Sequence, residues 1–593
     1  MLKLQLALDP GRVQLACDDE QIEELRKIAT RLVTATYVRP RVVEVDLDDL
    51  LVNVAEVANW PRDDEVLWSD ELGSIIRDNF SDAEAMRSRL NTDEVDGELQ
   101  MLSGGWLDEL RSFQKRDVSK LLSLKHGANF SVPGAGKTRA TLALLMNRMA
   151  QGSADRLLVV SPKSAFEAWS DEVSVTLGQG DFTPNIVTTN EELSGLVILV
   201  NYERLATMMP HLIRWMRLGK TMLVLDEAHR MKLGVRGQWG SACMQLAPFA
   251  SHRLILSGTP APNGSADLES LFSFVWPGQG TRHVRNAIST GSLKSASAAL
   301  RPLFTRTTKT ELELPPMTPT VRRVELPPLH REIYDALVWR ESVRLKRDGR
   351  NMADLGKVIL YLIMAATSPA LVAVGASRHE PLAYRVPPLE LPLDHDGRTM
   401  LEDLPNFELS PKYVEVAKIV QKNWQEGRKT LVWSTFVRNL TTLERILEPF
   451  NPAMVHGGTE DRADQIKKFR TDPTCAVLLS NPATLGEGIS FHHTCHDAVY
   501  VDRDFSAGRY LQSVDRIHRL GLAPDVRTNV TILVGANTID ELVELRLQQK
   551  LDFMGGILDD GNIMVLGDLA EEVSESAGLD ARDVEELLNH LKP

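Results

Sequence analysis

Short apolar runs, each followed at once by polar or glycine-rich residues, recur in two separate stretches of this chain. The first set is "RLLVVSPKS" (156–164), "LVILVNYE" (196–203), "TMLVLDEAH" (221–229) and "HRLILSGTP" (252–260). The second set is "KTLVWSTF" (429–436), "CAVLLSNP" (475–482), "DAVYVDRD" (497–504) and "NVTILVG" (529–535). Continuous apolar strands that alternate with helical stretches are typical of parallel sheets buried on both faces. The sequence therefore predicts an α/β fold with two parallel-sheet lobes in tandem.

The chain has 593 residues, more than one hydrophobic core normally holds, so several domains are expected. Residues 329–372 have apolar spacing near 3.6 and predict helices. The alternation in "VVEVDLDDL" (42–50) predicts a strand in a small folded accessory module. The expected divisions are an acidic N-terminal module (1–105), lobe one (106–299), a connector with a helical protrusion and linker (300–410), lobe two (411–550) and an acidic helical tail (551–593).

The net charge of −14 does not exclude a nucleic-acid partner, because residues 1–100 hold 11 Lys and Arg against 23 Asp and Glu. The remainder is nearly neutral and can carry a basic groove. No run of about 18 apolar residues predicts a membrane span. Lys3 and Asp9 interrupt the N-terminal apolar stretch, which argues against a secretion signal. The four cysteines form no C-x-x-C pair, so we expect a cytoplasmic protein without a disulfide framework or a zinc site.

The stretch "SVPGAGKT" (131–138), followed by a helical segment, has the features of a phosphate-binding loop. Small residues let backbone N–H groups surround phosphates, a lysine reaches the β- and γ-oxygens, and a Ser or Thr hydroxyl binds Mg²⁺. The helix N-terminus adds its positive dipole end. The full pattern has a glycine where Ser131 stands, and a structural turn is the alternative interpretation. The predicted ATP-binding residues here are Pro133, Gly134, Ala135, Gly136, Lys137 and Thr138.

A second motif strengthens this interpretation. In "LVLDEAHR" (223–230) an apolar run ends in Asp226 and Glu227, about 90 residues after the loop. The aspartate can hold Mg²⁺ through water, and the glutamate can take a proton from an attacking water. The two motifs together predict ATP and Mg²⁺ as cofactors. Gln114 lies upstream, and its amide suits an adenine edge, although a surface glutamine is the more common case.

The order of motifs resembles a known family. "LRSFQ", "PGAGKT", "VVSPKSAFEAW", "VNYERL", "DEAHRMK", "LSGTPAPN", "LRPLFTRTTKTELELPP", "LVWSTF", "LLSNPATLGEGIS" and "YLQSVDRIHRLG" resemble the helicase-like ATPases of the Swi/Snf type. These are double-stranded DNA translocases within the DEAD/DEAH helicase superfamily, and the resemblance covers residues 106–550. It implies two RecA-like lobes and ATP hydrolysis coupled to movement along DNA. "SNPATLGEGIS" is one residue longer than the usual pattern.

The resemblance also implies roles for individual residues. Lys137, Thr138, Asp226, Glu227 and Gly488 would serve the nucleotide, with Thr138 and Asp226 on the metal. Ser257, Gly258 and Thr259 would couple the nucleotide state to DNA. The loops expected to contact DNA, where an ordinary turn is the alternative, carry Pro162, Lys163, Asn201, Tyr202, Thr259, Ser434, Phe436, His456, Gly457 and Ser480.

The stretch "SVDRIHRLG" (513–521) places two arginines three residues apart. Gln512, Arg516 and Arg519 have the spacing of one helix face, so we expect one helix to carry all three. A solvated surface stripe is the simpler interpretation for an isolated pair. In a two-lobe ATPase, we expect the arginines to reach from lobe two to the γ-phosphate, where an arginine finger accelerates hydrolysis by about 10³–10⁵.

Two other functions remain open at this point. The same core could be an RNA helicase or RNA-dependent ATPase. Alternatively, the chain could be a nucleotide-gated subunit of a larger complex, with the acidic N-terminal module docking a protein partner. The complete set of carboxylates and arginines argues against a purely non-catalytic scaffold.

Overall fold

The structure is a computed structural model that divides into two compact units, residues 1–311 with 557–566 and residues 312–556 with 567–593. Each unit is described by itself. The structure describes residues 1–7, 11–61, 64–90, 110–178, 180–188, 192–231, 233–258, 265–289, 293–348, 352–380, 384–389, 409–485, 489–558 and 586–587.

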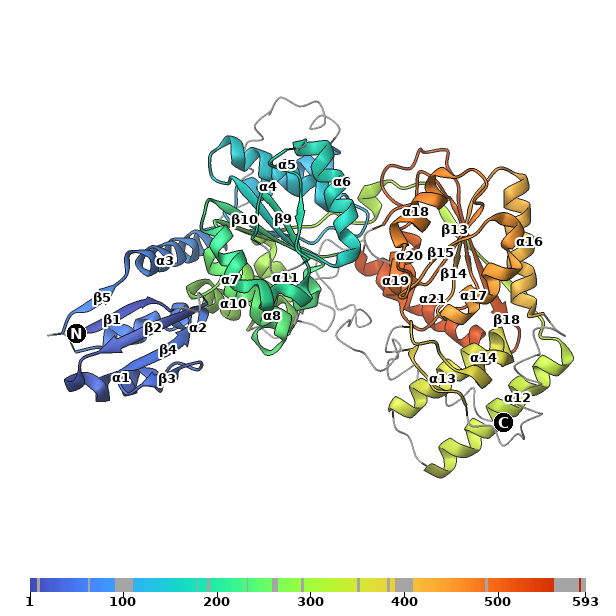
Figure 1. Cartoon of the computed structure of the whole chain (residues 1–593), viewed down its shortest axis with the longest axis horizontal. Coiled ribbons are helices and arrows are strands. Elements are labelled where there is room, and N and C mark those ends of the chain that lie inside the picture. Colours follow the sequence, from blue (N-terminus) through green and yellow to red (C-terminus); the bar gives the residue numbers. More distant parts are fainter. Residues whose placement is uncertain are drawn as a thin grey trace. The chain divides into compact units, whose positions relative to one another are not determined.

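Lobe one, which carries the labels β9 and β10 in Figure 1, is built on a sheet whose paired strands are all parallel, in the order β12-β6-β11-β10-β7-β9-β8. Its strands are β6 (Gly127–Asn129), β7 (Arg156–Val160), β8 (Asn185–Ile186), β9 (Val197–Val200), β10 (Thr221–Asp226), β11 (His252–Leu256) and β12 (Phe304–Thr305). The apolar runs predicted as strands are β7, β9, β10 and β11, so this prediction is confirmed.

Helices cover both faces of this sheet, which explains why the strands are apolar throughout. Leu157 and Val159 pack into one apolar cluster and Leu158 and Val160 into another. The first face is covered by α4 (Ser112–Leu122), α5 (Lys137–Ala150) and α6 (Phe166–Leu177). The second is covered by α7 (Leu205–Met216), α8 (Gln238–Leu246), α9 (Ser265–Val275), α10 (Gln279–Ile288) and α11 (Leu293–Leu300).

Lobe two repeats this architecture with the parallel order β13-β18-β17-β14-β16-β15. Its strands are β13 (Met317–Val324), β14 (Thr430–Trp433), β15 (Ala453–Val455), β16 (Val477–Ser480), β17 (Asp497–Tyr500) and β18 (Thr528–Gly535). The four predicted strands are confirmed as β14, β16, β17 and β18. The edge strand β13 lies in the segment that we expected to be a connector, and it pairs with β18 over its whole length.

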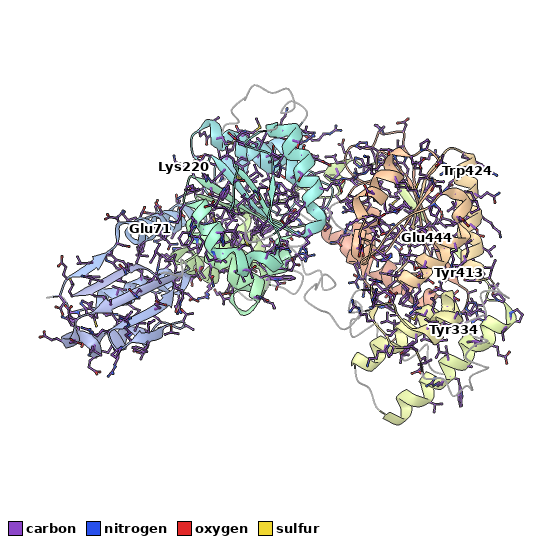
Figure 2. The ribbon with its side chains drawn as sticks, viewed as in Figure 1. Glu71, Lys220, Tyr334, Tyr413, Trp424 and Glu444 are labelled. Atoms are coloured by element: carbon purple, nitrogen blue, oxygen red, sulfur yellow. The ribbon has the colours of Figure 1, made fainter. Side chains whose placement is uncertain are left out.

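The helices of lobe two pack on both sheet faces and form the protrusion predicted over 329–372. One face carries α16 (Pro411–Gln425) and α17 (Val437–Ile446); the other carries α18 (Arg462–Thr471), α19 (Pro482–Leu485), α20 (Ala507–Val514) and part of α21 (Ile539–Leu558). The protrusion consists of α12 (Pro328–Asp348), α13 (Met352–Thr367) and α14 (Pro369–Val374). It is tied to α21, because the backbone N–H of Ile539 donates to the Tyr334 hydroxyl at 2.7 Å (Figure 2).

The N-terminal module is folded, as predicted, around a sheet in the order β3-β4-β2-β1-β5. Its elements are β1 (Leu2–Leu6), β2 (Arg12–Cys17), α1 (Ile22–Ala29), β3 (Thr36–Arg39), β4 (Val42–Asp46), α2 (Leu47–Val52), β5 (Val66–Trp68) and α3 (Asp70–Leu90). The strand predicted over 42–50 ends at Asp46, where α2 begins. The predicted tail beyond Leu558 lies outside the described residues except for 586–587. No helix among the described residues is long and apolar enough to cross a bilayer.

Helix α3 belongs to the core of lobe one as much as to the N-terminal module. Met86 lies in the same apolar cluster as the strands of lobe one. Asp82 is buried and accepts from His126 at 2.8 Å, Arg253 at 2.7 Å and Lys125 at 2.5 Å. His126 precedes β6 and Arg253 lies in β11. One carboxylate therefore joins α3 to the starts of two central strands.

A cleft between α3 and lobe one borders this ion cluster. Glu71 of α3 and Lys220, just before β10, both line it and are labelled in Figure 2. Glu71 also pairs with Arg217 at 2.5 Å. Acidic residues on α3 thus face basic residues of lobe one. Some acidic residues of the N-terminal segment therefore form ion pairs within this unit. A fragment that contains lobe one should include α3 in order to fold.

We expect Asp82→Asn to lower the free energy of unfolding at pH 7 by about 3–5 kcal/mol, because a buried charge pair loses one partner. Burial raises the pKa of Asp82, but the His126 hydrogen bond and the charge of Arg253 outweigh it and hold that pKa below its usual range. The contribution is therefore complete above the unfolded pKa of about 4 and declines as pH falls further.

Denaturant unfolding at pH 7 and pH 3.5 tests this, with the exposed Glu84→Gln on the same helix as control. A loss for Asp82→Asn no larger than that of Glu84→Gln at pH 7 would show that the cluster does not stabilise unit 1.

Candidate nucleotide-binding site

Three predicted motifs converge at the carboxyl edge of the lobe-one sheet. The phosphate loop follows β6, Ser257 and Gly258 follow β11, and Asp226 is the last residue of β10. These strands are neighbours, and Asn129, Leu256 and Asp226 are level because Leu256 pairs with both others. In open parallel sheets this edge is where ligands bind. The structure therefore brings the predicted nucleotide residues of lobe one together, while Thr259 lies outside the described residues.

The phosphate loop has the backbone that its glycines permit. Gly134 and Gly136 have φ of 80° and 73°, in the left-handed region where a side chain is strained. Helix α5 begins at Lys137, so the loop leads into a helix N-terminus. A Cβ at Gly258 would lie 2.7 Å from Cδ of Pro133, so the β11 loop needs glycine to approach the phosphate loop this closely.

Lys137 and Gln114 bind the loop itself in this structure. The Lys137 ammonium donates to the carbonyl of Ser131 at 3.0 Å, inside the loop where phosphate oxygens would accept. The Gln114 amide donates to the carbonyl of Ala135 at 3.1 Å and accepts from the N–H of Arg111 at 3.0 Å. Gln114 thus stabilises the phosphate loop by hydrogen bonding, and its contact with adenine remains a prediction.

Among the described residues, the hydrogen bonds to the Asp226 carboxylate come from neutral donors, although the charge of Lys137 also acts on it. It accepts from the Trp169 indole at 2.8 Å and from the N–H of Glu227 at 3.0 Å. Burial, and then the charge of Glu227, raise the pKa of Asp226 to about 6. An anion in this environment is stabilised by a divalent cation. The residues therefore fit the predicted Mg²⁺, with Thr138 in the first turn of α5 as the hydroxyl ligand.

Glu227 has a φ of 49°, which is uncommon for a residue other than glycine and is typical of functional sites. Its carboxylate lies 3.4 Å from Nδ1 of His229. Trp169 was not singled out from the sequence, because its partner is 57 residues away. Tyr202 was predicted to contact DNA, but its hydroxyl donates to the backbone carbonyl of Asp226 at 2.8 Å.

The loops predicted to contact DNA divide by exposure. Lys163 and Gly457 are exposed and His456 is half-buried. The remaining described side chains face the interior: Pro162, Asn201, Tyr202, Ser434, Phe436 and Ser480. The Ser434 hydroxyl donates to Asp502 at 2.5 Å, and that of Ser480 donates to the carbonyl of Val455 at 2.6 Å. A DNA contact at these buried positions would have to come from backbone groups or neighbouring residues.

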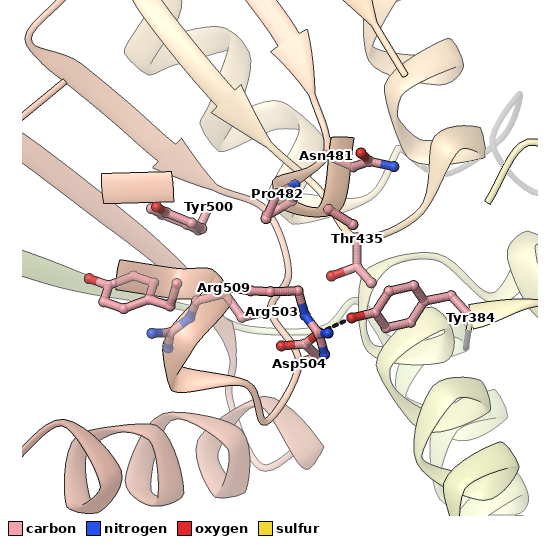
Figure 3. Close-up of a pocket in the computed structure, with 10 residues that line it drawn as sticks. Tyr384, Thr435, Asn481, Pro482, Tyr500, Arg503, Asp504 and Arg509 are labelled. Atoms are coloured by element: carbon pink, nitrogen blue, oxygen red, sulfur yellow. Dashed lines mark hydrogen bonds and ion pairs between the residues drawn. The ribbon is translucent and has the colours of Figure 1, made fainter. Parts of the chain in front are cut away.

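A small pocket lies where three strand-end loops of lobe two meet, after β14, β16 and β17 (Figure 3). Thr435, Asn481 and Arg503 line it, one from each loop. Tyr384 donates a hydrogen bond to Asp504, which also pairs with Arg509. The pocket shows that both lobes gather polar side chains at the carboxyl edge of their sheet. Gly488, predicted to bind ATP, lies outside the described residues.

The prediction that Gln512, Arg516 and Arg519 share a helix face is wrong. Helix α20 ends at Val514, and the two arginines lie in the turns that follow. The chain turns there because the N–H of Phe491 donates to the carbonyl of Arg516 at 2.7 Å. The Arg516 guanidinium is buried and donates to the carbonyls of Gln512 at 2.9 Å and Ile489 at 2.8 Å. Arg519 is half-buried.

We expect Asp226→Asn to raise the melting temperature of the nucleotide-free protein at pH 7.5. A folded pKa near 6 means that ionised Asp226 costs stability above that pH, about 1–3 kcal/mol, or about 3–8 °C in Tm. The gain shrinks as pH falls below 6, and it disappears near pH 4, the unfolded pKa, below which the carboxyl is protonated in both the folded and the unfolded state. Thermal unfolding at pH 7.5 and pH 5.0, with the exposed Asp181→Asn as control, measures this. An equal gain at both pH values would contradict the assigned burial of charge.

Comparisons with known proteins place this site in a family. The SNF2-related domain matches residues 130–368, and the helicase conserved C-terminal domain matches residues 411–521. Chromodomain-helicase-DNA-binding protein 1-like of Danio rerio is 27% identical over 481 residues, covering 76% of this chain and 43% of that protein. The chromatin structure-remodeling complex subunit snf21 of Schizosaccharomyces pombe is 23% identical, covering 78% of this chain and 40% of that protein.

The chain thus spans less than half the length of these two curated relatives. Among solved structures, the Sulfolobus solfataricus SWI2/SNF2 ATPase core in complex with dsDNA covers 83% of this chain and 100% of that one, at 20% identity and a TM-score of 0.33. The two domain matches follow one another in the order that the motifs predicted and together cover more than half of the chain, which identifies it as a member of the Swi/Snf-type helicase-like ATPases.

Proposed function

We propose that this chain is an ATP-dependent motor that moves on double-stranded DNA. The observation that carries the proposal is the convergence of the phosphate loop with Asp226 and Glu227 at one sheet edge, in a chain with a second parallel-sheet lobe. The alternative of a non-catalytic subunit is less favoured, because both carboxylates stand at the end of β10 beside the loop.

In this proposal, the loop amides and Lys137 bind the phosphates of ATP at the N-terminus of α5. Mg²⁺, held by Thr138 and by Asp226 through water, would neutralise the phosphate oxygens when bound. Glu227 accepts the proton of the attacking water. Its backbone φ is 49°, and its carboxylate lies 3.4 Å from Nδ1 of His229.

The arginines of lobe two complete the proposed chemistry, with Arg519 as the better candidate for the γ-phosphate. The Arg516 guanidinium already donates to two backbone carbonyls and holds the turn after α20. Arg519 is more exposed. We therefore assign Arg519 to the transferring phosphoryl group and Arg516 to the position of that turn.

For partners, we propose a duplex DNA backbone contacted by the strand-end loops, so that binding is independent of sequence and weakened by salt. The exposed Lys163 supports this in lobe one. We propose that the outer part of the N-terminal module, residues 1–61, docks a protein partner, because α3 is already committed to lobe one. A cytoplasmic location is proposed from the scattered, unpaired cysteines.

We expect Glu227→Gln to reduce ATP turnover by at least about 10³-fold and to abolish displacement of a third strand from duplex DNA, because the water loses its base. ATP binding should persist, since the loop is intact. Glu203→Gln, on an exposed residue of the same lobe, is the control. Normal turnover in Glu227→Gln would refute the assigned base, and displacement without turnover would refute a motor.

We expect Arg519→Ala to lower turnover by about 10³-fold without changing the melting temperature. Arg516→Ala should lower both, because two buried carbonyls lose their donor. Turnover and thermal unfolding of both variants check the assignment. If Arg516→Ala instead lost turnover with an unchanged melting temperature and Arg519→Ala did not, Arg516 would be the residue that contacts the γ-phosphate.

A further inference from the structure

Ser131 occupies the position where the full phosphate-loop pattern has glycine, and its hydroxyl is part of a buried network. The side chain is 1% exposed. The hydroxyl donates to Oδ2 of Asp117 at 3.0 Å and accepts from the backbone N–H of Thr307 at 2.9 Å. A residue that served only as a small substitute for glycine would make neither bond.

Asp117 connects this serine to a second hydroxyl. It lies in α4, is 3% exposed, and also accepts from the Thr307 hydroxyl at 2.9 Å, on the same oxygen as Ser131. Its other oxygen accepts from Arg116 at 3.1 Å and 3.2 Å. Arg116 in turn donates to the Thr307 hydroxyl at 3.1 Å. Each of the two hydroxyls therefore donates once to the carboxylate and accepts once from an N–H.

Thr307 belongs to the segment that leads from lobe one toward lobe two. That segment forms β12, which pairs with β6 at Ala128 and Asn129. The pairing continues toward the phosphate loop, where the N–H of Val132 donates to the carbonyl of Thr307 at 3.1 Å. The first segment of this unit, residues 1–311, ends at Glu311, which pairs with Arg116 at 2.5 Å. The connector is thus attached to the phosphate loop and to α4 just before it leaves the unit.

Helix α4 therefore holds the phosphate loop at two points and the connector at a third. Gln114 binds the carbonyl of Ala135 near the end of the loop, and Asp117 binds Ser131 at its start. A displacement of Thr307 would break both the hydrogen bond that its N–H donates to the Ser131 hydroxyl and the one that its carbonyl accepts from the N–H of Val132. These hydrogen bonds are sufficient to make the position of the phosphate loop depend on the position of the connector.

We propose that Asp117, Ser131 and Thr307 are positioning residues that couple the phosphate loop to the connector, so that the movement of lobe two on duplex DNA changes the rate of ATP hydrolysis. This rests on the proposed motor function. The residues act through the loop and touch neither ATP nor the attacking water. Ser131 thereby provides a coupling that glycine at this position would lack.

The decisive variant is Ser131→Gly, which restores the loop pattern and removes the hydroxyl. We expect the turnover number in saturating duplex DNA to fall about tenfold, while KM for ATP changes less than about threefold, as for loss of one buried hydrogen bond. Thr307→Val should have a similar effect. Thr307→Ser, which keeps the hydroxyl, should stay within about twofold of the wild type. Melting temperatures identify any variant that fails to fold.

The turnover of the double variant Ser131→Gly/Thr307→Val shows whether the two substitutions act on one network or lower turnover independently. If the two residues act as one network, the double variant should be no slower than the worse single variant. Multiplied losses would overturn the proposal, as would wild-type DNA stimulation in Ser131→Gly.

A readout that does not need turnover distinguishes this proposal from the motor function itself. Hydrogen exchange of residues 304–311 should slow when the wild type binds ATPγS with Mg²⁺, and this response should be lost in Ser131→Gly although ATPγS still binds. An unchanged response in Ser131→Gly would overturn the coupling and leave the motor proposal intact. Failure of the wild type to bind ATPγS would overturn both.

Discussion

The level pairing of β6, β11 and β10 is the constraint on which the rest of unit 1 depends. Leu256 pairs with Asn129 on one side and with Asp226 on the other. The phosphate loop, the Ser257–Gly258 turn and the acidic pair therefore leave the sheet at the same height. A register slip of one residue in β10 would turn every side chain of that strand to the opposite face. The apolar clusters on both faces fix the register, and the register in turn assembles the site.

Two buried aspartates in this unit show how environment divides structural from functional carboxylates. Asp82 is surrounded by His126, Arg253 and Lys125, which hold its pKa below the usual range, so it stays ionised and joins α3 to the sheet. Asp226 has an indole, a backbone N–H and the negative Glu227 as neighbours, and its pKa rises. The charged partners within the fold neutralise the first carboxylate, whereas we propose that a bound cation neutralises the second.

The sequence predicted what is encoded locally. Uninterrupted apolar runs predicted the central strands of both lobes, and the polar ends of those runs predicted the site, because the carboxyl ends of parallel strands share one edge. Features that depend on distant partners were not predicted. The Ser131 network joins Asp117 to Thr307, which lie 190 positions apart in the sequence. The edge strand β13 is polar in part, and only its pairing with β18 makes it a strand of lobe two.

The wrong prediction about the arginines has the same origin. Helical spacing in "SVDRIHRLG" ignores the N–H of Phe491, which binds the Arg516 carbonyl, and the carbonyl of Pro315, which lies 2.7 Å from Nε2 of His518. These tertiary bonds override the local pattern after Val514. Likewise, Ser434 and Ser480 lie in loops that were expected to contact DNA, but both side chains are buried and their hydroxyls donate to acceptors within lobe two. Local chemistry identified the loops, whereas burial decides which side chains reach outward.

The central claim, that this site is the engine of a duplex-DNA motor, is tested most directly by steady-state ATP turnover of the full chain with duplex DNA, single-stranded DNA and RNA in parallel. The account predicts that duplex DNA stimulates turnover most, independently of its sequence, and that the stimulation falls with rising salt because phosphate contacts dominate. Turnover that responds to RNA but not to duplex DNA, or to no nucleic acid at all, would contradict it.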